Sequence, residues 1–265
     1  MKLQFFGQSA RDASHPAAAS ARLVNLYREP TVGGRSGAVL RSVLGLQPFV
    51  EVGDFPIRAV YATGGAVFVA AGAKLWRAGP SGDLLELAAI ADDEKTTISA
   101  NGSNVVACAD GRYFVWDGTA ISEPTPGEIT VFQSVDYISH YTVLTERDGV
   151  KICWSDPADP ASLPGLNFTA ATPDDGNIVR SVVVGSNLWI FKPRSMEAFY
   201  VTGLPGALAL SRIDGTATQV GLLGFNLLCR VPNGAFFVGS DGRAYLLDAG
   251  VSAVTTPPVQ TAISG

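Results

Sequence analysis

The chain has 265 residues, of which 47% are apolar and 16% are charged, and its formal net charge is -5. This hydrophobic content excludes an intrinsically disordered protein, and no apolar run approaches the roughly 18 residues of a membrane-spanning helix. The 29 glycines and 16 prolines argue against a large helical bundle, because each interior Gly or Pro costs a helix about 1 to 3 kcal/mol. The 19 basic residues do not exceed the 24 acidic ones, which disfavours a groove that grips nucleic acid. A loop-rich, mostly β chain is predicted.

The first 56 residues differ in pattern from the rest. Residues 1–20 are predicted to form an arm with weak intrinsic order, and they lack the apolar core of a secretory signal. Residues 21–56 contain two extended segments joined by the flexible stretch TVGGRS. These extended strands are expected to precede a repeat-containing region over residues 57–265.

From about residue 57 the chain repeats one pattern: a β-rich run, a turn, and a second run that ends in or near an aromatic residue. The five copies are AVFVAAGAKLWRAG (66–79), NVVACADGRYFVWDG (104–118), YTVLTERDGVKICWSD (141–156), NLWIFKPRSMEAFYVTG (187–203) and GAFFVGSDGRAYLLDAG (234–250). An Asp-Gly turn between alternating hydrophobic residues is a strong β-hairpin signal, because such turns need positive φ. Each copy is therefore predicted to be a hairpin.

Closing aromatic residues give the period of the repeat. Trp76, Trp116, Trp154, Tyr200 and Tyr245 are spaced by 40, 38, 46 and 45 residues, which is the length of a four-stranded propeller blade. A blade has two apolar faces that it cannot bury alone, so blades stack around a ring. The prediction is an all-β β-propeller of about five to six blades, with these aromatics at matching places. An ordinary β-sandwich is the alternative.

The end of the repeat is less regular than its middle. The chain ends in TTPPVQTAISG, a stretch that has the pattern of another unit's start. Two possibilities stay open: the last blade is incomplete, or strands from residues 21–56 close the ring.

Residues with catalytic or redox chemistry are sparse. The three cysteines, Cys108, Cys153 and Cys229, form no Cys-x-x-Cys pair, and each lies in an apolar run where a free cysteine acts as a small hydrophobic residue. The two histidines, His15 and His140, are far apart in sequence. No hydrolase, P-loop or dinucleotide-binding motif is found, so no catalytic, cofactor-binding or metal site is predicted.

Acidic clusters are the remaining candidates for a site. They are Asp92, Asp93 and Glu94, then Asp156 and Asp159, and finally Asp174 and Asp175. Paired carboxylates serve glycosidases and oxygen-rich loops hold calcium, but Asp beside Pro or Gly usually stabilises its own turn. Turn chemistry is the favoured interpretation.

Basic residues and sequons carry little signal. Arg35 and Arg41 flank a glycine-rich segment, and Lys192 and Arg194 share a turn, so solvated surface charges are expected rather than a sparse contact with nucleic acid. Asn101 and Asn167 begin Asn-x-Ser/Thr sequons, which mean little without a secretory signal.

Several segments, in order, resemble a known family. Residues 154–203 carry Ser155-Asp156-Pro157, Leu166-Asn167-Phe168, Pro173-Asp174, Leu188-Trp189-Ile190-Phe191, Ser195-Met196-Glu197-Ala198-Phe199-Tyr200 and Thr202-Gly203. Upstream lie VNLYREP (24–30) and GAVLRSVLGL (37–46), and downstream lies FFVGSDGRAYLL (236–247). Together they resemble the packaged-DNA stabilisation, or tail accessory, proteins of short-tailed bacteriophages. Two departures are the greater length of family members and the Lys192-Pro193-Arg194 turn, where a small glycine turn is more usual.

The resemblance implies a structural role in a virion tail, after synthesis in the host cytoplasm. It implies a hexameric hub or nozzle ring below the portal and adaptor rings, with a tail needle or plug and other tail proteins as further partners. Such a ring retains the packaged double-stranded DNA and then lets it exit, without sequence-specific binding, and a mildly acidic inner wall would let the duplex slide. No enzyme activity, cofactor or membrane partner is implied.

Two other functions stay open because propellers host many activities. A carbohydrate-active or ligand-binding propeller would need paired carboxylates about 5 to 10 Å apart at the mouth of its channel. A generic interaction module would stay monomeric and bind no virion protein.

Overall fold

The computed structural model describes residues 26–30, 38–42, 45, 47–53, 56–90, 95–125, 127–172 and 175–255. The chain divides into two compact units. One contains an antiparallel hairpin of β1 (Leu26–Pro30) and β2 (Ala38–Ser42), in which Arg41 pairs with Glu29. The other unit, from Val50 to Thr255, holds all the remaining strands.

Five four-stranded antiparallel sheets make up this larger unit, and each is called a blade. Blade 1 is β3 (Ile57–Thr63), β4 (Ala66–Ala71), β5 (Lys74–Ala78) and β6 (Leu84–Ala89). Blade 2 is β7 (Thr97–Ala100), β8 (Val105–Ala109), β9 (Arg112–Trp116) and β10 (Ile121–Ser122). Blade 3 is β11 (Phe132–Ile138), β12 (Tyr141–Glu146), β13 (Lys151–Trp154) and β14 (Phe168–Ala170).

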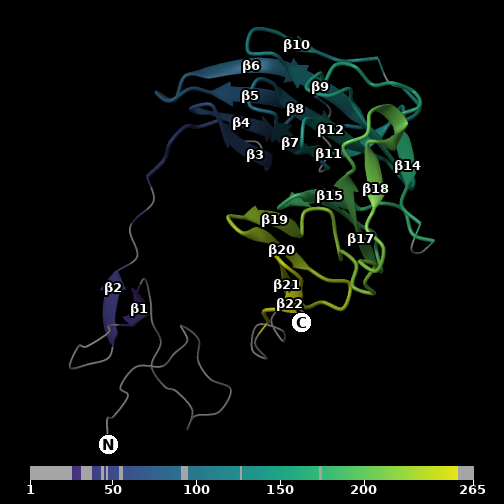
Figure 1. The fold of residues 1–265 in the computed structure, drawn as a ribbon. Helices are drawn as coiled ribbons and strands as arrows, with labels where there is room; N and C mark the ends of the chain where they lie inside the picture. The colour runs from purple at the N-terminus through teal and green to yellow at the C-terminus, as the bar shows by residue number, and fades with distance from the viewer. Residues whose placement is uncertain are drawn as a thin grey trace, which may run out of the picture. The chain divides into compact units, whose positions relative to one another are not determined.

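The last two blades follow the same plan. Blade 4 is β15 (Arg180–Val184), β16 (Asn187–Phe191), β17 (Met196–Val201) and β18 (Leu210–Arg212), with a 3-10 turn at Gly206–Leu208. Blade 5 is β19 (Leu228–Val231), β20 (Gly234–Val238), β21 (Ala244–Leu247) and β22 (Val251–Ala253). Strands pair in chain order within every blade, and the blades follow one another around an axis with β3, β7, β11, β15 and β19 innermost (Figure 1). The unit is a five-bladed β-propeller, as predicted.

The five predicted hairpins are confirmed, since each is the pair formed by the second and third strands of a blade. Turn chemistry explains the clearest of them. Asp110 and Gly111, between β8 and β9, have φ of 56° and 73°. Two consecutive positive φ values produce the type I′ geometry that suits the twist of a hairpin.

Blade 5 is complete, with four strands of its own between Leu228 and Ala253. This blade is therefore not cut short, and among the described residues of 21–56 the strands β1 and β2 pair with each other rather than with a blade. The terminal stretch after Thr255 lies outside the described residues.

Apolar clusters join each blade to the next. Blades 1 and 2 share two clusters, and single clusters join blades 2 and 3, 3 and 4, and 4 and 5. None of the clusters formed by the described residues joins blade 5 to blade 1. The free face of blade 1 is instead covered in part by Val50 and Val52, which pack with Val69 and Trp76.

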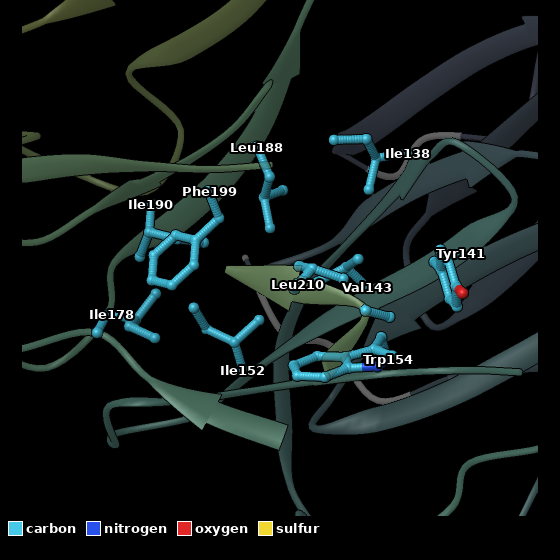
Figure 2. Close-up of a cluster of buried hydrophobic side chains, with 12 residues drawn as sticks. Ile138, Tyr141, Val143, Ile152, Trp154, Ile178, Leu188, Ile190, Phe199 and Leu210 are labelled. Atoms are coloured by element: carbon cyan, nitrogen blue, oxygen red, sulfur yellow. The ribbon is translucent and has the colours of Figure 1, made fainter. Parts of the chain in front are cut away.

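The cluster between blades 3 and 4 is built around Trp154. Its ring is fully buried, and side chains of blade 3, including Val143 and Ile152, meet Leu188 and Phe199 of blade 4 (Figure 2). The indole Nε1 of Trp154 donates a hydrogen bond to the carbonyl of Gly206 at 3.0 Å. Burial of a large aromatic with its one donor satisfied stabilises this interface strongly.

The five closing aromatics all lie on the third strand of their blades, but their surroundings differ. Trp116 packs against blade 1, the preceding blade, whereas Trp154 packs against blade 4, the following one. Tyr245 faces the preceding blade, and Tyr200 is 41% exposed. The prediction of matching places is right for the strand, and it is right for the face of Trp76, Trp116 and Tyr245, which all lie on the side turned away from the following blade. It is wrong for Trp154 and Tyr200, because a shift of one residue along a strand turns a side chain to the other side.

No helix among the described residues has the length and apolarity to cross a membrane.

Replacing Trp154 and Trp76 separately by Phe tests the role of the indole hydrogen bond. W154F removes the indole donor to the Gly206 carbonyl, which keeps its second bond from the Ala209 amide, and should lower the free energy of unfolding by about 0.5 to 1.5 kcal/mol more than W76F. The Nε1 of Trp76 is buried without a partner among the described residues, so W76F loses no such bond. Urea denaturation measures both, and equal losses would contradict the prediction.

The Asp110-Gly111 turn is tested by Gly111→Ala. A Cβ at this position would lie 2.7 Å from the Cγ1 of Val131, in a backbone with φ of 73°, so G111A should cost about 1 to 3 kcal/mol of stability. Gly165 is the control, because a Cβ added there would have no atom within 4 Å and its backbone has no positive φ. Thermal melting should show G165A close to wild type, within about 0.5 kcal/mol.

Candidate functional site

A cavity of about 1030 Å³ runs along the centre of the propeller. Each of the five innermost strands, β3, β7, β11, β15 and β19, contributes to its wall. The polar and charged residues of that wall are Arg58, Tyr61, Thr96, Thr97, Asp136, Arg180, Ser181, Asn226, Cys229 and Arg230. We call this cavity the central channel.

Hydroxyl groups connect the innermost strands where the blades converge. Ser134 Oγ of β11 lies 2.7 Å from Thr145 Oγ1 and 3.0 Å from Ser181 Oγ of β15. Thr97 Oγ1 of β7 accepts a hydrogen bond of 2.8 Å from the backbone amide of Val135. Because these groups are buried and bonded to one another, they fix the spacing of the strands around the channel without an unsatisfied polar atom.

Asp136 is the centre of a charged network across the channel. Its side chain is nearly buried, at 5% exposure for the residue, and it accepts hydrogen bonds from Ser181 Oγ at 2.5 Å and from Arg230. Arg230 comes from blade 5 and Asp136 from blade 3, so this ion pair spans non-neighbouring blades. Each of the two carboxylate oxygens thus has a donor, as a nearly buried carboxylate requires.

Arg180 at the start of β15 anchors the loop before β19. Its Nη1 donates to the carbonyls of Phe225 and Leu228, each at 3.1 Å, and its guanidinium lies 5.1 Å from the centre of the Phe225 ring. Burial lowers the pKa of Arg180, whereas the nearby Asp136 carboxylate raises it. The structure thus places a cation in the wall where desolvation opposes its charge.

Asp136 is the one carboxylate among the described lining residues. A pair of carboxylates of the kind that glycosidases need is therefore not found in this part of the wall. Three arginines line this channel, whereas the mildly acidic wall was predicted for the inside of a ring of several copies, a different surface for which it stays a prediction.

Turn chemistry explains Asp156 and Asp159. Asp156 Oδ2 accepts a bond of 2.6 Å from Ser162 Oγ, and Asp159 Oδ1 accepts one of 3.0 Å from the backbone amide of Ala161. Both carboxylates thus stabilise the segment after Trp154. Within the described ranges, no group of three or more His, Cys, Asp or Glu side chains is arranged to hold a metal ion.

The other acidic and histidine candidates are not brought together. Asp175 is exposed, and His140 is exposed in the β11–β12 turn, where its φ is 76°. The remaining members of these sets lie outside the described residues: His15, Asp92, Asp93, Glu94 and Asp174.

Lys192 contradicts the expectation of solvated basic turns. It lies between β16 and β17 and is only 1% exposed. The buried charge of Lys192 acts on the carboxylate of Glu197: burial raises the pKa of Glu197, and the positive charges of Arg212 and Lys192 oppose that rise. The expectation holds for Arg194, which is exposed in the same turn as Lys192. Arg41 is largely exposed, and Arg35 lies outside the described residues.

The two sequons and the cysteines are divided between buried and exposed positions. Asn101 caps its own turn by accepting bonds from the amides of Ser103 and Asn104, whereas Asn167 is buried. Cys108 and Cys153 are buried as predicted, but Cys229 is exposed and lines the channel.

Sequence reasoning missed the charged residues of the channel. A signal was present: three of the five innermost strands carry an arginine inside an apolar run, in IRAVYAT, RSVVV and LCRV. An arginine in an otherwise apolar strand next to the axis indicates a polar channel, because a charged side chain is almost never buried between apolar blade faces without a partner.

Thiol labelling at pH 8 tests the placement of Cys229 in an accessible wall. Burial raises the pKa of Cys153 to about 12, so its thiol is not ionised at that pH, and only thiolates react. Native protein should therefore react with Ellman's reagent at Cys229 alone, and the denatured chain at all three cysteines. Cys229→Ser should abolish the native reaction; labelling of a buried cysteine at a similar rate would contradict this placement.

Comparisons with solved structures find chains of low identity. Similar chains are the computationally designed Ika8 protein (TM-score 0.49, 16% identity, 87% of this chain and 70% of that one) and the designed Ika4 protein (TM-score 0.46, 16% identity, 59% and 99%). BamB from Moraxella catarrhalis is also similar, with a TM-score of 0.46 and 13% identity; the match covers 75% of this chain and 61% of that one. No curated protein sequence matches the chain.

The comparison with protein families is more informative. The family described as "Phage_stabilise: Bacteriophage P22 Gp10, beta-propeller" matches residues 3–252, nearly the whole chain. The propeller architecture agrees with that description, and so does the order of segments that resembles tail accessory proteins. The chain belongs to the Phage_stabilise family of bacteriophage β-propeller proteins.

Proposed function

We propose that the protein is a non-enzymatic part of a short bacteriophage tail. In this proposal it forms a hub or nozzle ring below the portal and adaptor, retains the packaged DNA and lets it exit. The observation that carries the proposal is the family match over residues 3–252, which identifies a phage structural protein. A tail needle or plug and other tail proteins are its proposed partners.

The size of the central channel supports a ring of several copies. Its 1030 Å³ is the volume of a site for a small molecule, about 300 to 1,000 Å³. A DNA duplex is too large for such a cavity. Several copies of the protein, in the proposal a hexamer, therefore have to surround the DNA together.

Exposed leucines on two neighbouring loops offer a contact surface for a partner. Leu166 is 78% exposed next to buried Asn167, whose carbonyl accepts a bond from the Trp154 amide. Leu204 and Leu208, 52% and 65% exposed, flank Gly206, which accepts the bond from the Trp154 indole. Both loops thus meet at Trp154, and we call Leu166, Leu204 and Leu208 the leucine patch. Clustered exposed apolar side chains are typical of protein interaction sites.

Negative-stain microscopy of the purified protein, with and without a portal–adaptor complex, tests the proposal. Ring-shaped particles with sixfold symmetry, alone or on the adaptor, are expected, with no turnover of polysaccharides. Monomers that do not bind the adaptor would contradict the hub role, and monomers that hydrolyse a polysaccharide would establish an enzyme instead.

Leu208→Asp tests the leucine patch in the same assay. A charge in an apolar contact should weaken assembly at least tenfold, because an unpaired charge at an interface core is costly. Leu85→Asp is the matched control, since Leu85 is 47% exposed on β6, away from the patch. Thermal melting of both variants checks that the fold is kept; equal assembly of L208D and L85D would exclude the patch.

A further inference from the structure

The central channel carries a surplus of positive charge that the rest of the chain does not share. Arg58, Arg180 and Arg230 line it, and Asp136 is the single acidic residue among the described lining residues. The described wall thus holds three arginines and one acidic residue, in a chain whose formal net charge is -5. A narrow cavity lined by one sign of charge attracts ions of the opposite sign.

The three arginines are not equivalent. Arg230 is matched by Asp136, and Arg58 donates from Nη1 to the carbonyl of Gly72. Arg180 has only neutral acceptors in the described part of the chain, the carbonyls of Phe225 and Leu228. No carboxylate of the described residues therefore contacts Arg180.

Arg180 also keeps a donor unused. Its Nε is buried and has no hydrogen-bond partner among the described residues, although buried N–H groups are nearly always bonded. Burial lowers the pKa of its guanidinium, so the charge is held at a cost that an anion would offset. An unpaired buried donor on a cation that no carboxylate contacts, beside a cavity, marks a site for an anion.

We propose that the central channel binds a small molecule through a phosphate or carboxylate group, with Arg180 as the principal contact. Arg58 and Arg230 line the same wall, and the hydroxyl of Thr97, which accepts a bond from the Val135 amide, can still donate its own proton to that group. The cavity of about 1030 Å³ accommodates such a molecule. This site is independent of the proposed role in a phage tail, and either stands if the other fails.

Isothermal titration calorimetry with the full chain tests the proposal, with inorganic phosphate and citrate as separate probes in low-salt buffer. At least one probe should bind with a Kd of about 1 mM or tighter, and binding should weaken with added sodium chloride. Binding of phosphate alone or of citrate alone identifies the chemical group that the site prefers. No heat from either probe at concentrations up to about 10 mM overturns the proposal.

Two variants with opposite expected effects locate the site. Arg180→Gln should weaken binding at least tenfold, because a charge-assisted hydrogen bond is lost. Asp136→Asn removes the one negative charge of the described wall and should tighten binding severalfold. Arg243→Gln is the control, since Arg243 lies on the exposed turn between β20 and β21, and it should bind as wild type does.

The gain expected for D136N cannot arise from misfolding. Should R180Q fail to fold, as circular dichroism would show, D136N still decides: tighter binding supports the site, and unchanged or weaker binding overturns it. Equal affinity of R180Q and wild type would overturn it as well.

Discussion

Every blade of this propeller has two apolar faces, and neither can be buried within the blade itself. The rest of the structure depends on this constraint, because only a neighbouring blade can remove those faces from water. Buried apolar surface is worth roughly 25 cal/mol per Å², so the clusters that join successive blades supply the main stabilisation. Trp154 illustrates the arrangement: its strand belongs to blade 3, but its ring packs with Leu188 and Phe199 of blade 4.

Radial stacking of the blades also determines which hydrogen bonds and ion pairs form at the axis. The innermost strands converge there, and their backbones and short polar side chains have to satisfy one another. Ser134 of blade 3 therefore bonds Ser181 of blade 4, and the Val135 amide bonds Thr97 of blade 2. Arg230 reaches from blade 5 to Asp136 in blade 3, which couples blades that share no face. The axis is thus a polar counterpart to the apolar interfaces farther out.

The sequence allowed the blades and their stacking around a ring to be predicted, but not the face that each aromatic side chain occupies or the residues that meet at the axis. Hairpins such as the one at Asp110-Gly111 depend on local turn chemistry, and the repeat length gave the architecture. The faces of Trp116 and Trp154 depend on strand register to within one residue, which periodicity does not resolve. The channel joins residues from all five blades, such as Asp136 and Arg230, which are 94 positions apart. Lys192 was misjudged because the turn that carries it is buried by later segments, where Gly221 packs on its backbone.

The volume of the channel distinguishes two roles of a ring-shaped fold, the enclosure of DNA and the binding of a small ligand. A cavity of this size cannot enclose a duplex, so any enclosure of DNA falls to surfaces between copies of the protein. The fold explains part of the charge at the axis, since Arg230 pairs with Asp136 and Arg180 bonds the carbonyls of Phe225 and Leu228. It gives no reason for the buried Nε of Arg180, which has no partner among the described residues. A buried donor without an acceptor costs free energy, and the proposed anion would offset that cost. The proposed small ligand thus accounts for the unused Nε of Arg180, a feature of the axis that neither the stacking of blades nor the enclosure of DNA requires.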